Sequence, residues 1–417
     1  METPLGRVLP RHVAEVVRVA LADTRVVLIN GARQCGKSTL ARLIGNEQDA
    51  TWLTLDNAQS REAARYDPTE FVSRNGLTVI DEVQREPDLL LAIKERVDEN
   101  PRPGQYLLTG SARVMALRVV PDALPGRMET VELWPLSQGE IDGAPDGFVD
   151  AAFASGPELA HTSVLSKADY IERLVRGGFP EAVARTAARR ERFLDSYLSD
   201  LLRRDVMQLA EIQRSNELAR MLRLLAARSG QILVASNLAA DLGLPQSTTA
   251  RYLSLLEEVF LIRRIPAWSA NLTRRATATP KVAFVDSGVA ANLLGQRLTT
   301  LSGDIRQLGG LLEGFVAMEL LRQLSWSEER VQLSHYRTRD KVEVDIVLEN
   351  RQGQVIGIEV KAASSVATSD FSGLRHLQRQ LGERFLVGLV LYTGKTTVPF
   401  GPDLRAMPIS AIWETSR

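Results

Sequence analysis

The residues best suited to chemistry lie in the run GARQCGKST, residues 31–39. This run matches G-x-x-x-x-G-K-[ST], the pattern of loops that bind nucleotide phosphates. Gly31 and Gly36 let the backbone curl so that its N–H groups face one anion. Lys37 would reach the β- and γ-phosphates, and the Ser38 hydroxyl would ligate Mg²⁺. The run therefore predicts a site for ATP and Mg²⁺, with the nucleotide-binding residues Gly31, Ala32, Arg33, Gln34, Cys35, Gly36, Lys37, Ser38 and Thr39.

A pair of acids ends a second apolar run, LTVIDEV, residues 77–83. Such a run is typical of a buried parallel strand. Asp81 suits the Walker B role, in which a carboxylate holds Mg²⁺ through its water shell. Glu82 is placed to orient and deprotonate the attacking water. Apolar runs also end in Asp-Glu where a strand simply leaves the core, but the phosphate-binding loop upstream favours the catalytic interpretation.

A third run, YLLTGSA at residues 106–112, ends in two hydroxyl side chains. Thr109 or Ser111 could sense the γ-phosphate from the neighbouring strand. Both could equally do no more than cap the end of their own strand. The residues alone do not separate these alternatives.

The elements that must position these side chains follow from the same pattern. Residues 1–141 alternate apolar strands with helical runs, which predicts an α/β domain with a parallel sheet. Residues 142–160 are rich in Gly, Ala, Pro and Asp and predict a linker. Apolar residues at three- and four-residue spacing predict a helical domain over 161–275. Strands return afterwards, so we expect a second α/β domain over 276–417.

A helix-turn-helix candidate lies inside the helical region. The short helix 238–244 would stop at Gly243, and the next helix would begin near residue 247. Its polar leading face could enter a DNA groove, and the candidate DNA-binding residues are Gln246, Thr248, Thr249 and Arg251. The strand-like run 260–268 would be the wing. A small helical bundle without DNA contact is the alternative.

A second acidic group lies near the C-terminus. Asp345 ends an alternating strand, and Glu359 and Lys361 project from one face of the next strand. Two carboxylates that converge on a metal beside a lysine suit phosphodiester hydrolysis, and Glu313 on the preceding helix could add a third. The order matches D…E-x-K, the signature of restriction-endonuclease-like nucleases. A solvated Glu359–Lys361 ion pair is the alternative, and ancestry does not imply retained activity.

Composition limits the remaining classes. The 417 residues fit two or three domains, with 44% hydrophobic and 24% charged residues. A formal net charge of zero argues against a strongly basic nucleic-acid binder but leaves room for a local basic face. We expect such a face at Arg203, Arg204, Arg263, Arg264, Arg274 and Arg275. The sequence lacks a long apolar run and a signal-like start, so we expect no membrane partner and a cytoplasmic location.

Nearly the whole chain resembles the prokaryotic AAA-type ATPases that carry a C-terminal domain of unknown function. The resemblance rests on VVLINGARQCGKSTLAR, LTVIDEVQ, YLLTGSAR and LPGRMETVELWPLSQGE, and then on RGGFPEAV, YLSDLLRRDV, YLSLLEEVFLIRRIPAW, KVAFVDSGVAANLLG, LLEGFVAMEL and EVDIVLE…GIEVKAAS, in this order. It implies an AAA-type P-loop ATPase domain of the ASCE class, a winged-helix middle domain and a nuclease-like C-terminal domain. Cys35 departs from the small aliphatic residue more usual in the family.

The resemblance also implies that Arg127 lies near a subunit boundary, as a candidate arginine finger acting in trans. Arg113 is the second candidate, and a salt bridge of Arg127 inside its own subunit is the alternative. The leading hypothesis is an ATP-hydrolysing AAA-type protein that forms a homo-oligomeric ring and acts on DNA. The alternative is a nucleotide-driven oligomeric switch that regulates a protein partner and carries an inactive nuclease-like domain.

Overall fold

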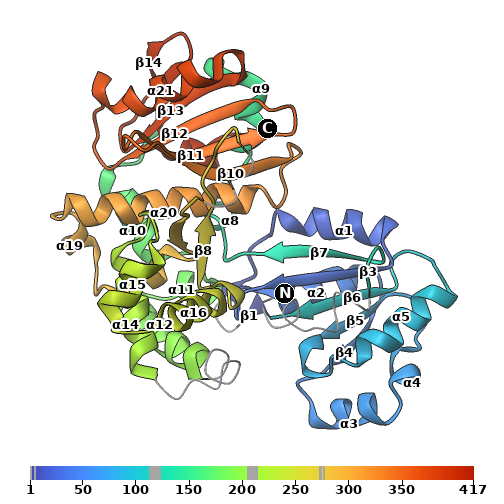
Figure 1. Ribbon diagram of the computed structural model, residues 1–417. Coiled ribbons are helices and arrows are strands. Elements are labelled where there is room, and N and C mark those ends of the chain that lie inside the picture. Colours follow the sequence, from blue (N-terminus) through green and yellow to red (C-terminus); the bar gives the residue numbers. More distant parts are fainter. Residues whose placement is uncertain (1, 4–5, 112–123, 204–214, 272–274, 276–277) are drawn as a thin grey trace. The chain divides into compact units, whose positions relative to one another are not determined.

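The computed structural model describes residues 2–3, 6–111, 124–203, 215–271, 275 and 278–417. The chain divides into two compact units (Figure 1). The N-terminal unit comprises Val8–Leu136 and Glu258–Phe260, and the C-terminal unit comprises Glu2–Arg7, Ser137–Glu257 and Leu261–Arg417. Among the described residues, no helix is both long and apolar enough to cross a membrane.

A five-stranded parallel sheet forms the centre of the N-terminal unit, in the order β4-β5-β6-β3-β7. Its strands are β3 (Val26–Gly31), β4 (Thr51–Thr54), β5 (Thr78–Asp81), β6 (Tyr106–Gly110) and β7 (Met128–Leu133). All residues of β3, β5 and β6 are buried, as expected for parallel strands covered on both faces. The prediction of an α/β domain with a parallel sheet is confirmed.

Helices cover this sheet (Figure 1). They are α1 (Val13–Asp23), α2 (Lys37–Glu47), α3 (Ala58–Tyr66), α4 (Pro68–Val72) and α5 (Leu89–Glu99), with a 3-10 turn over Val83–Arg85. Helix α1 packs against β3 and β7, and α2 packs against β5 and β6. Buried apolar side chains such as Leu28, Ile80, Ile93 and Leu108 form the core, which holds the carboxyl ends of the strands in a fixed arrangement.

The C-terminal unit begins with helices. They are α8 (Gln138–Asp142), α9 (Phe148–Ser155), α10 (Lys167–Arg176), α11 (Pro180–Val183), α12 (Ala187–Leu201), α14 (Ser215–Ala227), α15 (Ala235–Leu242) and α16 (Gln246–Glu258), with a 3-10 turn over Gly156–Glu158. The strands β1 (Glu2–Thr3) and β2 (Gly6–Arg7) pair with each other. The predicted stop at Gly243 is confirmed, because this residue ends α15 in the left-handed conformation.

The prediction of a linker over residues 142–160 is wrong. Helix α9 and the 3-10 turn over Gly156–Glu158 fill most of this stretch, and Phe148, Val149 and Phe153 are buried. The Val149 N–H donates to Gln323 Oε1 at 3.1 Å, and the Gly147 N–H donates to the Thr415 carbonyl at 2.8 Å. The Gly and Pro residues that suggested a linker lie mostly in the turns on either side of the helix. The apolar residues between these turns are buried.

A six-stranded mixed sheet follows, in the order β10-β11-β12-β13-β15-β14. Its strands are β10 (Val331–Arg337), β11 (Glu343–Asn350), β12 (Val355–Lys361), β13 (Phe385–Tyr392), β14 (Val398–Gly401) and β15 (Leu404–Pro408). The remaining elements are α18 (Ser287–Leu293), α19 (Leu298–Leu301), α20 (Ile305–Gln323), α21 (Ser372–Leu381), α22 (Ala411–Glu414) and 3-10 turns at Thr368–Phe371 and Gly382–Arg384. Helix α21 packs against β11, β12 and β13, and α20 packs against β12.

The expected domain boundary between residues 275 and 276 does not separate two compact units. Strand β8 (Ile262–Ile265) pairs antiparallel with β9 (Lys281–Phe284) across it. Helix α20 packs on β9 as well as on β12. The expected boundary near residue 141 is close to the observed division, which falls after Leu136.

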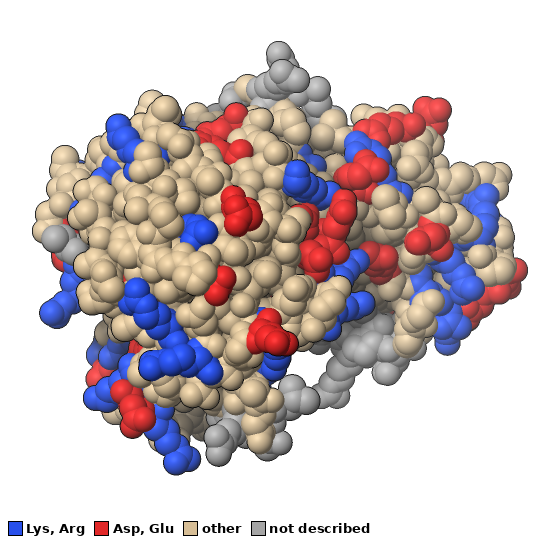
Figure 2. All heavy atoms as spheres, turned by 90° about the horizontal axis from the view of Figure 1, so that it is seen from above, with Lys and Arg blue, Asp and Glu red and all other residues tan. Residues whose placement is uncertain are grey.

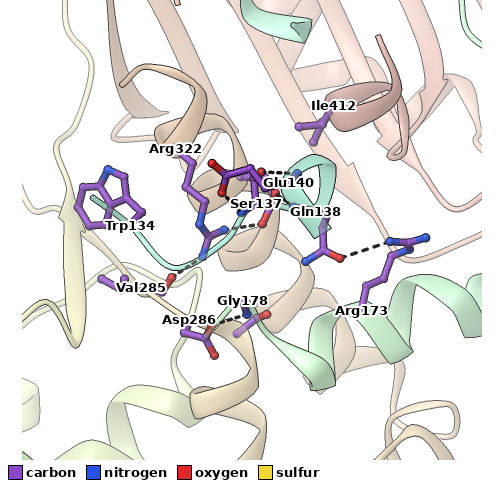
Figure 3. A network of polar contacts seen from close by, with 12 residues as sticks. Trp134, Ser137, Gln138, Glu140, Arg173, Gly178, Val285, Asp286, Arg322 and Ile412 are labelled. Atoms are coloured by element: carbon purple, nitrogen blue, oxygen red, sulfur yellow. Dashed lines mark hydrogen bonds and ion pairs between the residues drawn. The ribbon is translucent and has the colours of Figure 1, made fainter. Parts of the chain in front are cut away.

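A buried polar network ties distant segments of the C-terminal unit together (Figure 3). The Glu319 carboxylate pairs with Arg322 and accepts the Gln138 N–H at 2.9 Å, and Arg322 also donates to the Val285 carbonyl at 2.8 Å. Burial raises the pKa of Glu319 to about 7, against the opposing effect of Arg322. Arg176 donates to the side chain of Gln138 at 2.8 Å. Residues 137–176 and helix α20 are therefore parts of one body.

A second contact in Figure 3 joins two of the sequence blocks quoted above. Asp286 accepts N–H groups from Gly178 at 2.6 Å and from Val289 at 3.0 Å, and it caps α18. Gly177 has φ +68°, and a Cβ there would lie 2.3 Å from Asp286 Oδ1. Only glycine fits both the conformation and the space, which explains the RGGFP turn.

The variant Arg322→Met is expected to lower the free energy of unfolding by about 3–5 kcal/mol, because it leaves the Glu319 carboxylate buried without its cation. Urea-induced unfolding measures the loss. The double variant Glu319→Gln with Arg322→Met is the matched control, and it should lose less because no charge remains unpaired. A loss below about 1 kcal/mol for the single variant, as for a solvent-exposed pair, would contradict the burial argument.

Candidate functional site

The phosphate-binding loop joins β3 to α2, as the motif requires. Gly36 is left-handed, with φ +104°, and Gln34 has φ +62°. A Cβ at Gly31 would lie 2.1 Å from the Leu133 carbonyl oxygen at the end of β7. Both glycines of the motif therefore meet physical demands, one for conformation and the other for close approach of two backbones.

Lys37 is the first residue of α2, and only 5% of it is exposed. Its ammonium donates to the carbonyl oxygens of Gly31 at 3.0 Å and Ala32 at 2.8 Å. The cation thus lies over the turn of the loop, where the backbone N–H groups and the N-terminus of α2 favour an anion. This arrangement suits the phosphates of a nucleotide.

Asp81 and Ser38 meet at the carboxyl edge of the sheet. The Ser38 hydroxyl donates to Asp81 Oδ1 at 2.7 Å, and Thr109 on the neighbouring strand β6 donates to the same oxygen at 2.5 Å. Asp81 is 7% exposed. A hydroxyl and one carboxylate are hard oxygen ligands, and Mg²⁺ in phosphate-transfer sites uses one or two carboxylates together with substrate phosphates. These residues therefore fit the ion that the motif implies.

Glu82 follows with φ +60°, an uncommon conformation for a residue with a side chain. Its N–H donates to Thr109 Oγ1 at 3.1 Å. The amide of Gln84 donates both to the Glu82 carboxylate and, at 3.1 Å, to Ser111 Oγ. Strained conformations that the surrounding structure enforces are frequent at active sites. Thr109 thus contacts Asp81 directly, and Ser111 is linked to Glu82 through the Gln84 amide, so both hydroxyls do more than cap their own strand.

Sequence reasoning did not find Gln84 or Arg11. Arg11 donates to the Cys35 carbonyl at 2.9 Å and to the Trp134 carbonyl at 2.6 Å, so it fastens the loop to the end of β7. Neither residue belongs to a motif quoted above for its chemistry. Cys35 itself is fully buried, and its thiol lies 3.3 Å from the Leu133 carbonyl. The cysteine side chain, which departs from the family pattern, therefore fills space in the protein interior.

Arg127 lies at the start of β7, whereas the phosphate-binding loop meets the end of that strand. Its guanidinium pairs with Asp98 through Nε–Oδ1 at 2.5 Å and Nη2–Oδ2 at 3.0 Å. This hydrogen-bonded pair lowers the pKa of Asp98. The described chain thus contains the intrasubunit salt bridge that was the alternative for Arg127, and Arg113 lies outside the described residues.

The C-terminal acids also converge. Asp345 on β11 accepts the Val360 N–H at 3.0 Å through Oδ2. Its Oδ1 accepts from the ammonium of Lys281, a residue of β9, at 3.2 Å, and the same ammonium pairs with Glu313 on α20. Lys281 is 3% exposed and was not singled out from the sequence. A charged residue at the start of the buried run KVAFV was the available signal.

The pKa values of this cluster are shifted strongly from their ordinary values. Burial and the neighbouring Asp345 raise the pKa of Glu313 to about 8. Burial and Asp345 also raise the pKa of Glu359. Burial opposes the charge of Lys281, but Glu313 and Asp345 outweigh it and raise the lysine pKa. Lys361 is 36% exposed and lies 3.9 Å from both Glu359 and Asp370, so it stands at the rim.

The candidate DNA-binding face of α16 is only partly available. Gln246 and Arg251 are exposed and Thr248 is half-buried. Thr249 is fully buried, and its hydroxyl donates to the Pro245 carbonyl at 3.2 Å, so its assignment as a DNA-contacting residue is wrong. The helices α14 to α16 are followed by the two-stranded sheet of β8 and β9.

The expected basic stripe is weakened by acidic partners. Arg264 pairs with Glu257 at 2.6 Å, and Arg275 pairs with Glu349 at 2.7 Å. Arg204 and Arg274 lie outside the described residues. On the face drawn in Figure 2, basic side chains lie among acidic ones. A neighbouring carboxylate lowers the local positive potential of each of these arginines.

Comparisons with known proteins agree with this site. Residues 23–142 match a model for an AAA domain, residues 167–300 match a domain of unknown function (DUF8612), and residues 308–412 match another domain of unknown function (DUF4143). The AAA match covers the loop and the acids that contact Ser38 and Thr109, and it supports nucleotide hydrolysis as the general activity.

Relatives and solved structures complete the comparison. The Walker-type ATPase of Pyrococcus abyssi has a TM-score of 0.42 at 16% identity, over 69% of this chain and 96% of that chain. A Haemophilus influenzae protein described as uncharacterized is 22% identical over 68% of this chain and 65% of its own length. A Mycobacterium tuberculosis protein, also described as uncharacterized, is 31% identical over 97% of this chain and 85% of its own length. The chain therefore belongs to the same family as this mycobacterial protein, and its N-terminal part is an AAA-type ATPase domain.

Proposed function

We propose that the protein hydrolyses ATP in a Mg²⁺-dependent reaction at the loop of residues 31–39. The observation that carries this proposal is the contact of Ser38 and Thr109 with one oxygen of Asp81, beside the buried Lys37. These groups come from three different elements and meet at one edge of a parallel sheet, where such folds bind ligands.

Each side chain has a defined task in this proposal. Ser38 and Asp81 hold Mg²⁺, which neutralises phosphate charge when it is bound. Lys37 exchanges the carbonyl oxygens of Gly31 and Ala32 for phosphate oxygens. Glu82 takes the proton of the attacking water. Thr109 and Gln84 hold the acids in place through the contacts described above.

The proposal includes a homo-oligomeric ring in which Arg127 reaches the nucleotide of a neighbouring subunit. Such an arginine stabilises charge that develops on the transferred phosphoryl group. In the described chain Arg127 is paired with Asp98, so this role requires that assembly break an exposed salt bridge. Breaking such a pair costs little, on the order of 1 kcal/mol or less.

We propose DNA as the target, bound through the exposed residues of α16. The pairing of Arg264 and Arg275 with carboxylates and the burial of Thr249 favour a second candidate. In this second candidate, ATP drives a change of oligomeric state, and the output is contact with a protein partner. The two candidates share the ATPase site and differ in what stimulates it.

Steady-state ATP hydrolysis with Mg²⁺ separates them. Single-stranded, duplex and branched DNA are added at one fixed salt concentration, because phosphate contacts weaken steeply as salt rises. The DNA proposal predicts that one form raises kcat, and that Arg251→Ala lowers this stimulation while leaving the DNA-free rate unchanged. Arg379→Ala, which removes an exposed arginine of α21, is the matched control.

Hydrolysis that no DNA form alters, with a mass that changes between ATP and ADP, would support the oligomeric switch instead. Mass photometry on the same samples gives the oligomeric state. Absence of hydrolysis in every condition would contradict the shared ATPase proposal.

A further inference from the structure

The carboxylates at Glu313, Asp345 and Glu359 have the residue types of a nuclease metal site, but a cation of the chain already lies among them. The ammonium of Lys281 contacts Asp345 Oδ1 at 3.2 Å and pairs with Glu313. The lysine is 3% exposed, so its charge has no access to bulk water. A buried ammonium persists only where opposite charges surround it.

Asp345 has little capacity left for a metal ion. Its Oδ1 accepts from Lys281, and its Oδ2 accepts the Val360 N–H at 3.0 Å. Each oxygen of the Asp345 carboxylate thus already has a partner inside the chain, so a divalent ion would have to share that oxygen or displace the partner.

Electrostatics disfavour a divalent ion beside this buried ammonium. Mg²⁺ lies about 2.1 Å from its ligand oxygens, so an ion on Asp345 Oδ1 would lie at most about 5.3 Å from the Lys281 nitrogen, which is 3.2 Å from that oxygen. Like charges at this separation repel strongly in a buried site. The cluster described here therefore does not fit a catalytic Mg²⁺.

We propose that the ammonium of Lys281 takes the place of the divalent ion, and that the nuclease-like site of this chain is a metal-free structural centre. Lys281 comes from β9, Glu313 from α20 and Asp345 from β11, so the cation joins three elements of the C-terminal unit. Its function is to hold the sheet against α20, and phosphodiester cleavage is absent.

Binding of Mn²⁺ to the nucleotide-free full-length protein tests this proposal. Electron paramagnetic resonance of free Mn²⁺ counts the ions bound by the wild type, by Asp345→Asn and by Glu359→Gln. We expect the three proteins to bind the same amount of Mn²⁺. The C-terminal acids should bind none, and the weak binding at Ser38 and Asp81 is the same in all three. Binding by the wild type that either substitution abolishes would overturn the proposal. Cleavage of DNA with Mg²⁺ or Mn²⁺ that Asp345→Asn abolishes would overturn it too.

Lys281→Ala provides the complementary test. Without the ammonium, the acids should bind an additional Mn²⁺ per chain, at least about tenfold more tightly than the wild-type protein at this position. Lys281→Arg keeps a cation there and should gain nothing. Lys281→Ala combined with Asp345→Asn should lose the gain, which assigns the new ion to this cluster. A folded Lys281→Ala protein with no added Mn²⁺ would overturn the claim that the lysine occupies the position of the ion. If this variant does not fold, the comparison of wild type with Glu359→Gln still decides.

Discussion

Lys37→Ala is expected to lower kcat/KM for ATP hydrolysis by about 10²- to 10³-fold, the loss found when one preorganised charge-stabilising donor is removed. The ammonium is buried above the loop, where its interaction with phosphate oxygens is stronger than it would be in water. Its present partners are two backbone carbonyls, which phosphate oxygens would replace as acceptors. The loss should appear in nucleotide affinity as well as in kcat.

A coupled phosphate-release assay and a fluorescent ATP analogue measure the two quantities. Lys94→Ala, on α5 of the same unit and outside the loop, is the control for loss of a lysine and should leave both unchanged. Normal hydrolysis by Lys37→Ala would place the ATPase site elsewhere in the chain. Circular dichroism of the variant excludes unfolding as the cause of a loss.

Glu82→Gln is expected to lower kcat by about 10²- to 10⁴-fold, the contribution typical of a general base. Its effect on ATP binding should be small, because glutamine keeps the size of the side chain and only the proton acceptor is lost. The same substitution preserves the backbone contact of residue 82 with Thr109, which the left-handed conformation aims at β6. The variant should therefore hold ATP without turning it over.

Single-turnover hydrolysis together with the Kd for ATP separates the two effects. Glu95→Gln, an exposed acid on α5, is the matched control. A Glu82→Gln protein that binds ATP weakly would assign this acid to metal or phosphate binding in place of proton transfer. A protein that hydrolyses ATP at the wild-type rate would remove Glu82 from the reaction altogether.

The two expected results differ because the proposal assigns phosphate binding and charge stabilisation to one residue and proton transfer to another. In the proposed reaction, Lys37 acts in binding and in the transition state, whereas Glu82 acts only on the attacking water. Gln84 connects Glu82 to the end of β6, because its amide contacts both the Glu82 carboxylate and Ser111, the residue after this strand. Loss of this amide contact would let the Glu82 side chain move relative to β6.

Local sequence pattern was sufficient for the ATPase domain. The loop residues are consecutive, so their glycines and lysine form a site wherever the strand and helix form. Asp81 could be placed near Ser38, 43 residues away, because the carboxyl ends of parallel strands meet at one edge. Thr249 could also have been placed correctly, because it repeats with Tyr252, Leu253 and Leu256 at the spacing of a buried helix face.

The sequence by itself thus determined the phosphate-binding loop, the acids behind it and the parallel sheet that brings them together. Only the tertiary structure decided that Lys281 enters the acidic cluster of Glu313 and Asp345, that residues 148–155 pack as a helix, and that Arg127 pairs with Asp98. The physical reason is the range of the interactions. Periodicity and turn chemistry act between neighbours in the chain, whereas the pairing of a buried charge depends on how separate elements pack, which no short pattern records.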